Sequence, residues 1–287
     1  MSSAAATFPL EQVVWRPKVN PWLIGATVSI AAFVVVLDTS VANVALPYIA
    51  GGLGASYDDS TWVLTSYLAA NAIILPMSGW LAEIIGRKQY FMLSLSIFTF
   101  SSLLCGLAPS LPVLLFFRAL QGIGGGGLQP MAQAILNDSF PPEKRGVALA
   151  LYGISAVLAP TVGPMLGGWI TDNYSWRWIF FITLPPVLAA LYLTYTLVED
   201  PPFLRRIKRG GIRVDYMGIS MLALGVGALQ VLLDKGQEDD WLGSHFITTL
   251  AITAAVCLIT LVIWEWFRKD PIVDVRMFKS LTSPRRT

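Results

Sequence analysis

The stretch Gly79-Trp80-Leu81-Ala82-Glu83-Ile84-Ile85-Gly86-Arg87-Lys88 places one acid and two bases between two long apolar runs. Charged side chains so close to hydrocarbon are costly and mark functional positions. The glycines Gly79 and Gly86 permit close approach and a sharp turn. Glu83 and Arg87 stand four residues apart, which is the spacing of an ion pair on one helix face. The stretch therefore predicts a short charged loop between two spanning helices, with five candidate functional residues: Gly79, Glu83, Gly86, Arg87 and Lys88.

The rest of the chain continues this apolar pattern. Of its 287 residues, 55% are hydrophobic and 13% are charged, whereas about 25% are charged in a soluble domain. A spanning helix needs about 20 mainly apolar residues. Eight segments meet this requirement: 22–46, 61–79, 90–107, 111–136, 147–169, 178–198, 216–233 and 246–267. The short connections between the first six predict an all-α bundle in lipid, because each spanning helix satisfies its own backbone hydrogen bonds.

The basic residues divide unequally between the two sides of such a bundle. If the tail 1–21 is cytoplasmic, 17 of the 20 Lys and Arg residues fall in inner segments, and the exceptions are Arg118, Arg177 and Lys235. Because inner loops of membrane proteins carry an excess of bases, this distribution predicts eight spans with both termini cytoplasmic. No signal peptide is apparent in residues 1–20, so the first span is expected to remain in the mature protein.

The opening stretch has a second, fainter copy. Gly79-Trp80-Leu81-Ala82-Glu83 is echoed 89 residues later by Gly168-Trp169-Ile170-Thr171-Asp172. The first copy follows the second span on the inside, and the second copy follows the fifth span on the outside. A three-span unit repeated in opposite orientation is typical of secondary transporters. Coincidence in a chain rich in glycine and tryptophan is the alternative explanation.

Two spans carry polar residues at membrane depth. A carboxylate at the centre of a spanning helix costs about 2.5–3.5 kcal/mol on insertion scales, so Asp38 should face a cavity or a partner. Low polarity favours its protonated form, so Asp38 can bind a proton and release it on exposure. Arg118 and Gln121 share a helix face and, with Asp38, predict a site whose charge changes with protonation. The alternatives are an Asp38 bonded to Thr39 or to a neighbouring helix and an Arg118 that extends to the interface.

Segment 147–169 concentrates proline and glycine. Proline removes a backbone hydrogen bond, and glycine permits close packing between helices. A pliable and closely packed helix predicts a moving interface, although packing alone would explain single members of the set. The candidate residues are Pro160, Gly163, Pro164, Gly167 and Gly168.

Few residues could support another chemistry. Cys105 and Cys257 lie inside apolar runs and are interpreted as small core residues rather than a disulfide or metal pair. The single histidine, His245, excludes most histidine-based sites. The sequence offers no Ser/His pair, metal cluster or paired catalytic aspartates at membrane depth, so it predicts neither an enzyme nor a metal site. The net charge of +2 gives no indication of a nucleic-acid partner.

These motifs together resemble the major facilitator superfamily, and within it the fourteen-helix drug:proton antiporter branch (EmrB/QacA-like). Residues 79–88 look like its Gly-x-Leu-Ala-Asp-x-x-Gly-Arg-Lys motif, in which Glu83 replaces the usual aspartate. Residues 38–47 resemble its first-helix motif. Residues 118–124 resemble its Arg-x-x-Gln-Gly motif, which is linked to proton coupling, and residues 163–168 resemble its antiporter motif of helix five.

The resemblance implies a particular domain organisation. The chain would hold the N-terminal six-helix bundle, built as a 3+3 inverted repeat, and the two additional helices of the branch, whereas the C-terminal bundle would be missing. The expected parts are a cytoplasmic tail (1–21), the bundle (22–198), a basic cytoplasmic linker (199–215), the two additional helices (216–267) and a cytoplasmic tail (268–287). The basic linker either enforces topology or contacts anionic headgroups.

The resemblance also implies a function, which is proton-coupled efflux of amphipathic drugs across a bacterial inner membrane. Protonation of Asp38 would compete with drug binding, and Arg118 and Gln121 would sense or relay the proton. No cofactor is expected, because a proton gradient drives the cycle. The expected partners are the lipid bilayer, drugs, protons and, in a Gram-negative cell, a periplasmic adaptor and an outer-membrane channel. The alternative is a non-transporting remnant or a partner-binding membrane protein.

Overall fold

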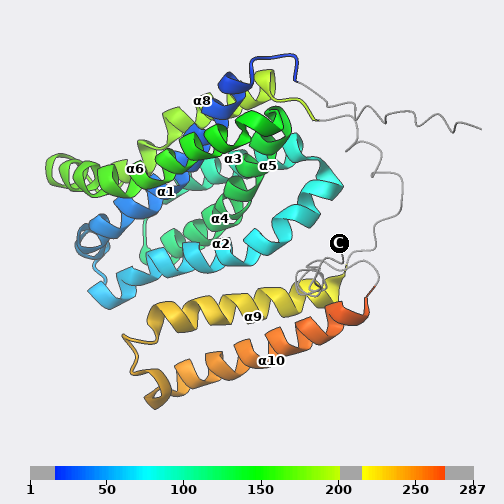
Figure 1. Cartoon of the computed structure of the whole chain (residues 1–287). Coiled ribbons are helices and arrows are strands. Elements are labelled where there is room, and N and C mark those ends of the chain that lie inside the picture. The colour runs from blue at the N-terminus through cyan, green and yellow to red at the C-terminus, as the bar shows by residue number, and fades with distance from the viewer. Residues whose placement is uncertain (1–16, 201–214, 269–287) are drawn as a thin grey trace, which may run out of the picture.

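The protein is helical throughout the residues that the computed structural model describes, which are 17–200 and 215–268 (Figure 1). A short 3-10 turn, η2 (Trp241–Gly243), joins the last two helices. The helices are α1 (Pro21–Leu53), α2 (Tyr57–Ile85), α3 (Arg87–Gly106), α4 (Leu111–Gly126), α5 (Leu128–Ser139), α6 (Pro142–Asn173), α7 (Trp178–Phe181), α8 (Leu184–Leu197), α9 (Tyr216–Lys235) and α10 (His245–Phe267).

Eight helical stretches in the described residues are long and apolar enough to cross a membrane, so the predicted all-α bundle is confirmed. Two of them are interrupted. The fourth breaks between α4 and α5 after a run of glycines that ends at Gly127, because glycine is a poor helix former. The sixth breaks between α7 and α8 just before Pro185, whose missing N–H suits a helix start.

Several helices extend beyond the predicted apolar segments. α1 has 33 residues because Asn20 caps its first turn and Gly54, in the left-handed conformation with φ 64°, ends it. α6 has 32 residues and starts at Pro142, a residue suited to a first helical turn. Apolar length therefore locates a span, whereas capping residues outside the hydrocarbon set where its helix ends.

The first six spans form two interleaved three-span units. The first unit is α1, α2 and α3, and the second runs from α4 to α8. α1 packs along α6 and α8 of the second unit, and α4 packs along α2 and α3 of the first (Figure 1). The first helix of each unit thus lies against the second and third helices of the other. This symmetric exchange supports the predicted internal repeat.

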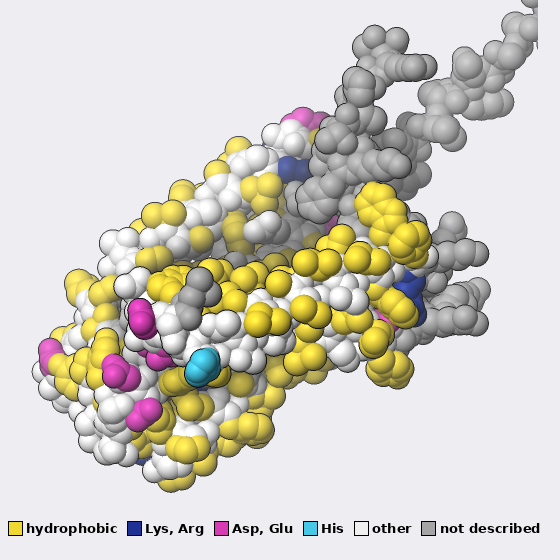
Figure 2. Space-filling model, turned by 90° about the horizontal axis from the view of Figure 1, so that it is seen from below, with side chains coloured by type: hydrophobic (Ala, Val, Ile, Leu, Met, Phe, Trp, Pro, Cys, Tyr) yellow, Lys and Arg dark blue, Asp and Glu magenta, His cyan; other side chains and the backbone are white. Residues whose placement is uncertain are grey.

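Helices α9 and α10 form a hairpin beside this bundle. The two helices pack on each other, and α9 also lies along α2 (Figure 1). Hydrophobic side chains are spread over the face of the molecule seen from the hairpin side, while most of the visible acidic side chains lie at one end and most of the visible basic side chains lie towards the other (Figure 2). An apolar band between charged ends is the surface expected of helices that cross a bilayer.

Candidate functional site

The three polar residues predicted at membrane depth meet at the centre of the bundle. Asp38 comes from α1, while Arg118 and Gln121 come from α4, so the first helix of each three-span unit contributes. Asp38 is 2% exposed, and the other two side chains are fully buried. The fold thus joins groups that are 80 or more residues apart in the chain.

The three side chains form a closed network of hydrogen bonds. Arg118 Nη1 donates to Asp38 Oδ2 at 2.6 Å and to Gln121 Oε1 at 2.8 Å. Gln121 Nε2 donates to Asp38 Oδ1 at 3.0 Å, so both carboxylate oxygens are occupied. A fourth bond joins the network to α2, because Arg118 Nε donates to the carbonyl oxygen of Val63 at 3.1 Å. Such charge-assisted bonds are roughly twice as strong as neutral ones.

This geometry decides between the alternatives for Asp38 and Arg118. The Thr39 hydroxyl donates to the carbonyl of Val36 and leaves the Asp38 carboxylate to the neighbouring helix α4. The Arg118 guanidinium points into the protein and not to the interface, since none of its side chain is exposed. The neighbouring-helix alternative is therefore observed for Asp38, and its partner is Arg118.

Aromatic rings enclose the guanidinium. Arg118 Cζ lies 4.5 Å from the centroid of the Tyr67 ring and 5.6 Å from that of Phe180, both within range of a cation–π interaction. Arg118 Nη2 has no hydrogen-bond acceptor among the described residues. The site therefore combines a tightly paired carboxylate with one buried donor that is available to a further polar group.

The charged loop between α2 and α3 is tied to other helices. Gly86 has φ 100°, a conformation that side-chain-bearing residues rarely adopt, and it separates the two helices. Arg87 forms an ion pair with Asp138 of α5. The backbone N–H of Lys88 donates to Asp200 at 2.8 Å, and its ammonium donates to the carbonyl of Tyr195 at 2.7 Å. Arg87 and Lys88 thus fasten the start of α3 to α5 and to the end of α8.

The predicted pair between Glu83 and Arg87 is wrong. The positive φ of Gly86 ends α2 before Arg87, so the two residues do not share a continuous helix and helical spacing does not apply. Glu83 is exposed, and Arg87 turns to Asp138 instead. The predicted loop is also shorter than expected, because residues 79–85 are the last turns of α2 and only Gly86 lies between the helices. Gly79 therefore makes no turn, and it makes no close approach either, since an ideal Cβ built there would meet no atom within 4 Å.

The corrected pairing has a measurable consequence. Replacing Asp138 by Asn is expected to lower the free energy of unfolding by about 1 kcal/mol, because a partly exposed ion pair rarely contributes more. Glu83→Gln is the matched control and is expected to have no measurable effect. Unfolding of both purified variants in mixed micelles by dodecyl sulfate tests this. A larger loss for Glu83→Gln than for Asp138→Asn would contradict the pairing.

The α6 residues divide between two faces. Gly163 and Gly167 face α1: an ideal Cβ would lie 2.4 Å from Ser40 Oγ at the first and 3.1 Å from the Val41 carbonyl oxygen at the second. The contacted α1 residues follow Asp38 closely in sequence. Pro160 and Pro164 are exposed on the outer face, and Gly168 has no neighbour within 4 Å of an ideal Cβ. α6 therefore packs closely against the part of α1 that carries Asp38.

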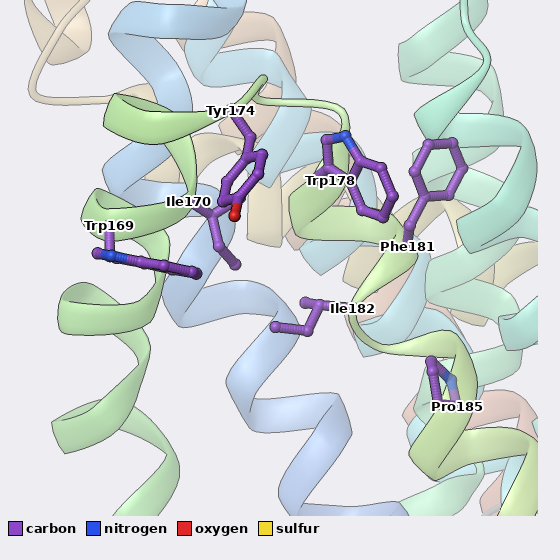
Figure 3. Close-up of a pocket in the computed structure, with 7 residues that line it drawn as sticks. All are labelled: Trp169, Ile170, Tyr174, Trp178, Phe181, Ile182 and Pro185. Atoms are coloured by element: carbon purple, nitrogen blue, oxygen red, sulfur yellow. The ribbon is translucent and has the colours of Figure 1, made fainter.

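A cavity of about 460 Å³ lies where α6, α7 and α8 meet (Figure 3). It is apolar and contains part of the echoed motif, but none of the three network residues. Its lining residues are Trp169, Ile170, Tyr174, Trp178, Phe181, Ile182 and Pro185. No sequence motif predicted this cavity, although the aromatic residues between 169 and 181 were a visible signal. Its volume and lining suit an apolar chain or ring.

A bundle of two interleaved three-span units, with a buried ion pair between their first helices, is typical of the secondary-transporter class. Consistent with this architecture, residues 28–267 match the Major Facilitator Superfamily. The chain belongs to this superfamily of transporters and is not an enzyme.

Several curated relatives are similar to this chain. It is 46% identical over 258 residues to the multidrug export protein EmrB of Haemophilus influenzae. This match covers 90% of the present chain and 50% of the relative. It is 44% identical over 252 residues to the multidrug export protein EmrB of Escherichia coli K12, and the match covers 88% of this chain and 48% of that relative. It is 45% identical over 253 residues to the fatty acid resistance protein FarB of Neisseria gonorrhoeae, and the match covers 88% of this chain and 49% of that relative. The chain spans about half the length of the curated relatives it matches.

Solved structures share the fold at low identity. A peptide transporter of the POT type aligns with a TM-score of 0.60 at 15% identity, covering 88% of this chain and 57% of that one. A D-xylose–proton symporter aligns with a TM-score of 0.54 at 18% identity, covering 84% of this chain and 66% of that one. These structures support the architecture of the bundle and nothing more specific.

Proposed function

We propose that this chain forms the proton-coupling bundle of a multidrug exporter of the EmrB type, in which proton and drug compete at the Asp38–Arg118–Gln121 network. The observation that carries the proposal is the closed and buried set of bonds among these three side chains. An ionisable group inside a membrane bundle is by default a functional site. The names of the relatives, which include multidrug export proteins, agree with this substrate class.

The network gives protonation a structural effect. With Asp38 ionised, its two oxygens hold Arg118 and Gln121 in place. A proton on Asp38 removes the negative charge and leaves the guanidinium buried without its counter-ion, which is strongly unfavourable. The site must then rearrange or admit another partner. An amphipathic compound that displaces the proton restores the ionised state, so the two ligands alternate.

Neighbouring elements would transmit this change. The α2–α3 junction would act as a cytoplasmic gating element, with Gly79 and Glu83 in the last turns of α2, Gly86 between the helices, and Arg87 and Lys88 at the start of α3. α6 would slide on α1 through Gly163 and Gly167. The membrane potential would contribute roughly 2.3 kcal/mol per charge moved across 100 mV. The proposed location is a bacterial inner membrane with both termini cytoplasmic. An adaptor and an outer-membrane channel would act as partners in a Gram-negative cell.

Proton release tests the proposal directly. Adding tetraphenylphosphonium, an amphipathic cation, to the purified chain in weak buffer, at a pH acid enough for Asp38 to be protonated at the start, is expected to release protons in proportion to bound compound. The Asp38→Asn variant should release none, because the amide carries no titratable proton. Asp239→Asn, which changes an exposed acid between α9 and α10, is the control and should behave as the parent. Equal release from the parent and Asp38→Asn would reject the site.

Dye efflux from energised vesicles separates transport from binding. A transporting chain should move dye, and Asp38→Asn should abolish proton-driven efflux. The alternative function, a non-transporting remnant or a partner-binding membrane protein, predicts no proton-driven efflux from the parent chain in the same preparation.

A further inference from the structure

The α9–α10 hairpin is attached to α2 by a group of polar side chains near one end of both helices. Thr65 donates its hydroxyl hydrogen to Asp234 of α9. The ammonium of Lys235 donates to the Thr61 hydroxyl and, at 2.5 Å, to Glu238. These five residues, Thr61, Thr65, Asp234, Lys235 and Glu238, are called the α2–α9 clasp below.

The clasp is buried where it meets α2. Thr65 is fully buried, and Lys235 is 3% exposed. The Lys235 ammonium also lies 5.3 Å from the centroid of the Trp62 ring, against which Phe246 of α10 packs. Burial of an ammonium group is costly unless it is paired and hydrogen-bonded, and Lys235 satisfies both conditions. The clasp is therefore a specific attachment and not a set of solvated surface charges.

Polar groups matter more than apolar ones for placing this hairpin. Its other contacts with α2 are apolar and centre on Met77, Leu222 and Leu261. In a bilayer such contacts bring little selectivity, because lipid tails are equally apolar, whereas hydrogen bonds between helices fix position. The clasp thus sets the register of α9 on α2.

The same short segment of α2 also holds the buried network. Val63 lies between the two clasp threonines, and its carbonyl oxygen accepts the hydrogen bond from Arg118 Nε at 3.1 Å. Val63 is fully buried. At Gly122 of α4, an ideal Cβ would lie only 2.3 Å from the Tyr67 carbonyl oxygen, so α2 and α4 already touch through their backbones. A shift of α2 would consequently move the acceptor that orients the guanidinium.

We propose that the clasp positions the Val63 carbonyl for Arg118, which makes Thr65, Asp234 and Lys235 positioning residues of the proton site. The hairpin is then a working part of that site and not a passive extension of the bundle. The link to transport rests on the proposed function, whereas the geometric link between the clasp and Arg118 is measurable without it.

Hydrogen exchange at Arg118 Nε–H tests the geometric link. Arginine labelled with ¹⁵N in the full chain, held in lipid nanodiscs, gives a side-chain resonance that Arg118→Lys assigns by its loss. Thr65→Val removes the clasp hydroxyl and is expected to speed exchange with water about tenfold, because a net hydrogen bond accounts for a factor of this order. Thr65→Ser keeps the hydroxyl and should restore the slow rate.

Thr249→Val is the matched control, because Thr249 is an exposed threonine on α10 whose hydroxyl donates to its own helix at 2.7 Å. It should leave the exchange rate unchanged. Lys235→Met should act as Thr65→Val does, and Asp234→Asn carries the same test if Thr65→Val does not fold. Slow, parent-like exchange in folded clasp variants would overturn the inference. Proton release from the parent tests the proposed function, and Arg118 Nε–H exchange tests the link between the clasp and Arg118. Because the two measurements are independent, either proposal can fail while the other holds.

Discussion

Replacing Asp38 by Leu is expected to lower the free energy of unfolding by about 3–5 kcal/mol, because removing one partner of a buried ion pair leaves an uncompensated charge. The charge left behind belongs to Arg118, whose side chain is fully buried and bonded to Asp38 at 2.6 Å. Unfolding of the purified chain by dodecyl sulfate in mixed micelles measures the loss. The double variant with Arg118→Met should recover most of it, since an apolar pair of similar volume is often no less stable.

A matched control separates this effect from a general cost of removing acids. Asp239→Leu makes the same substitution at an exposed acid and should leave the free energy of unfolding nearly unchanged. If Asp38→Leu proved as stable as Asp239→Leu, the pair would not exist as a buried ion pair. If the double variant were no more stable than Asp38→Leu, the loss would come from packing and not from the unpaired charge.

Alanine at Gly122 or Gly124 is expected to be the second most damaging change. An ideal Cβ would lie 2.3 Å from the Tyr67 carbonyl oxygen at Gly122 and 2.6 Å from the Phe98 backbone N at Gly124. Both obstacles are backbone atoms, so α2 or α3 must move as a whole. Overpacking of this kind costs about 1–3 kcal/mol and occasionally more. The same micelle unfolding experiment measures it.

Gly153→Ala is the control for these glycines, because it lies within α6 and an ideal Cβ there meets nothing within 4 Å. Alanine is favoured over glycine in a helix interior by about 0.8–1.0 kcal/mol, so this variant should be at least as stable as the parent. A parent-like stability of both Gly122→Ala and Gly124→Ala would show that α4 does not contact its neighbours through their backbones.

Much of the architecture follows from local sequence. The apolar length of each run locates its span, because a helix in lipid needs a minimum number of apolar residues. The network at Asp38 is also predictable in part, because a carboxylate, a guanidinium and an amide at membrane depth need partners and find them in one another. The functional roles of these residues remain predictions.

The remaining contacts depend on tertiary structure. Asp138 binds Arg87 across 51 residues of chain, and neither spacing nor periodicity relates the two. The Val63 contact uses a backbone carbonyl, which every residue possesses, so no residue type signals it. Lys235 was visible only as an exception to the distribution of bases between the two sides. Its burial against α2 explains the exception, because the Lys235 ammonium binds Thr61 and Glu238 within the protein and is not a free charge in a loop.

The exchange of helices between the two three-span units has a consequence for biogenesis. Asp38 is synthesised 80 residues before Arg118, which corresponds to about 4–16 s at 5–20 residues per second. During that interval α1 has neither α4 nor α6 to pack against, and an ionised Asp38 in hydrocarbon would cost about 2.5–3.5 kcal/mol. The nascent α1 would therefore wait at the insertion machinery or enter lipid with Asp38 neutral. The ion pair would close only after the ribosome has delivered α4, the first helix of the second unit.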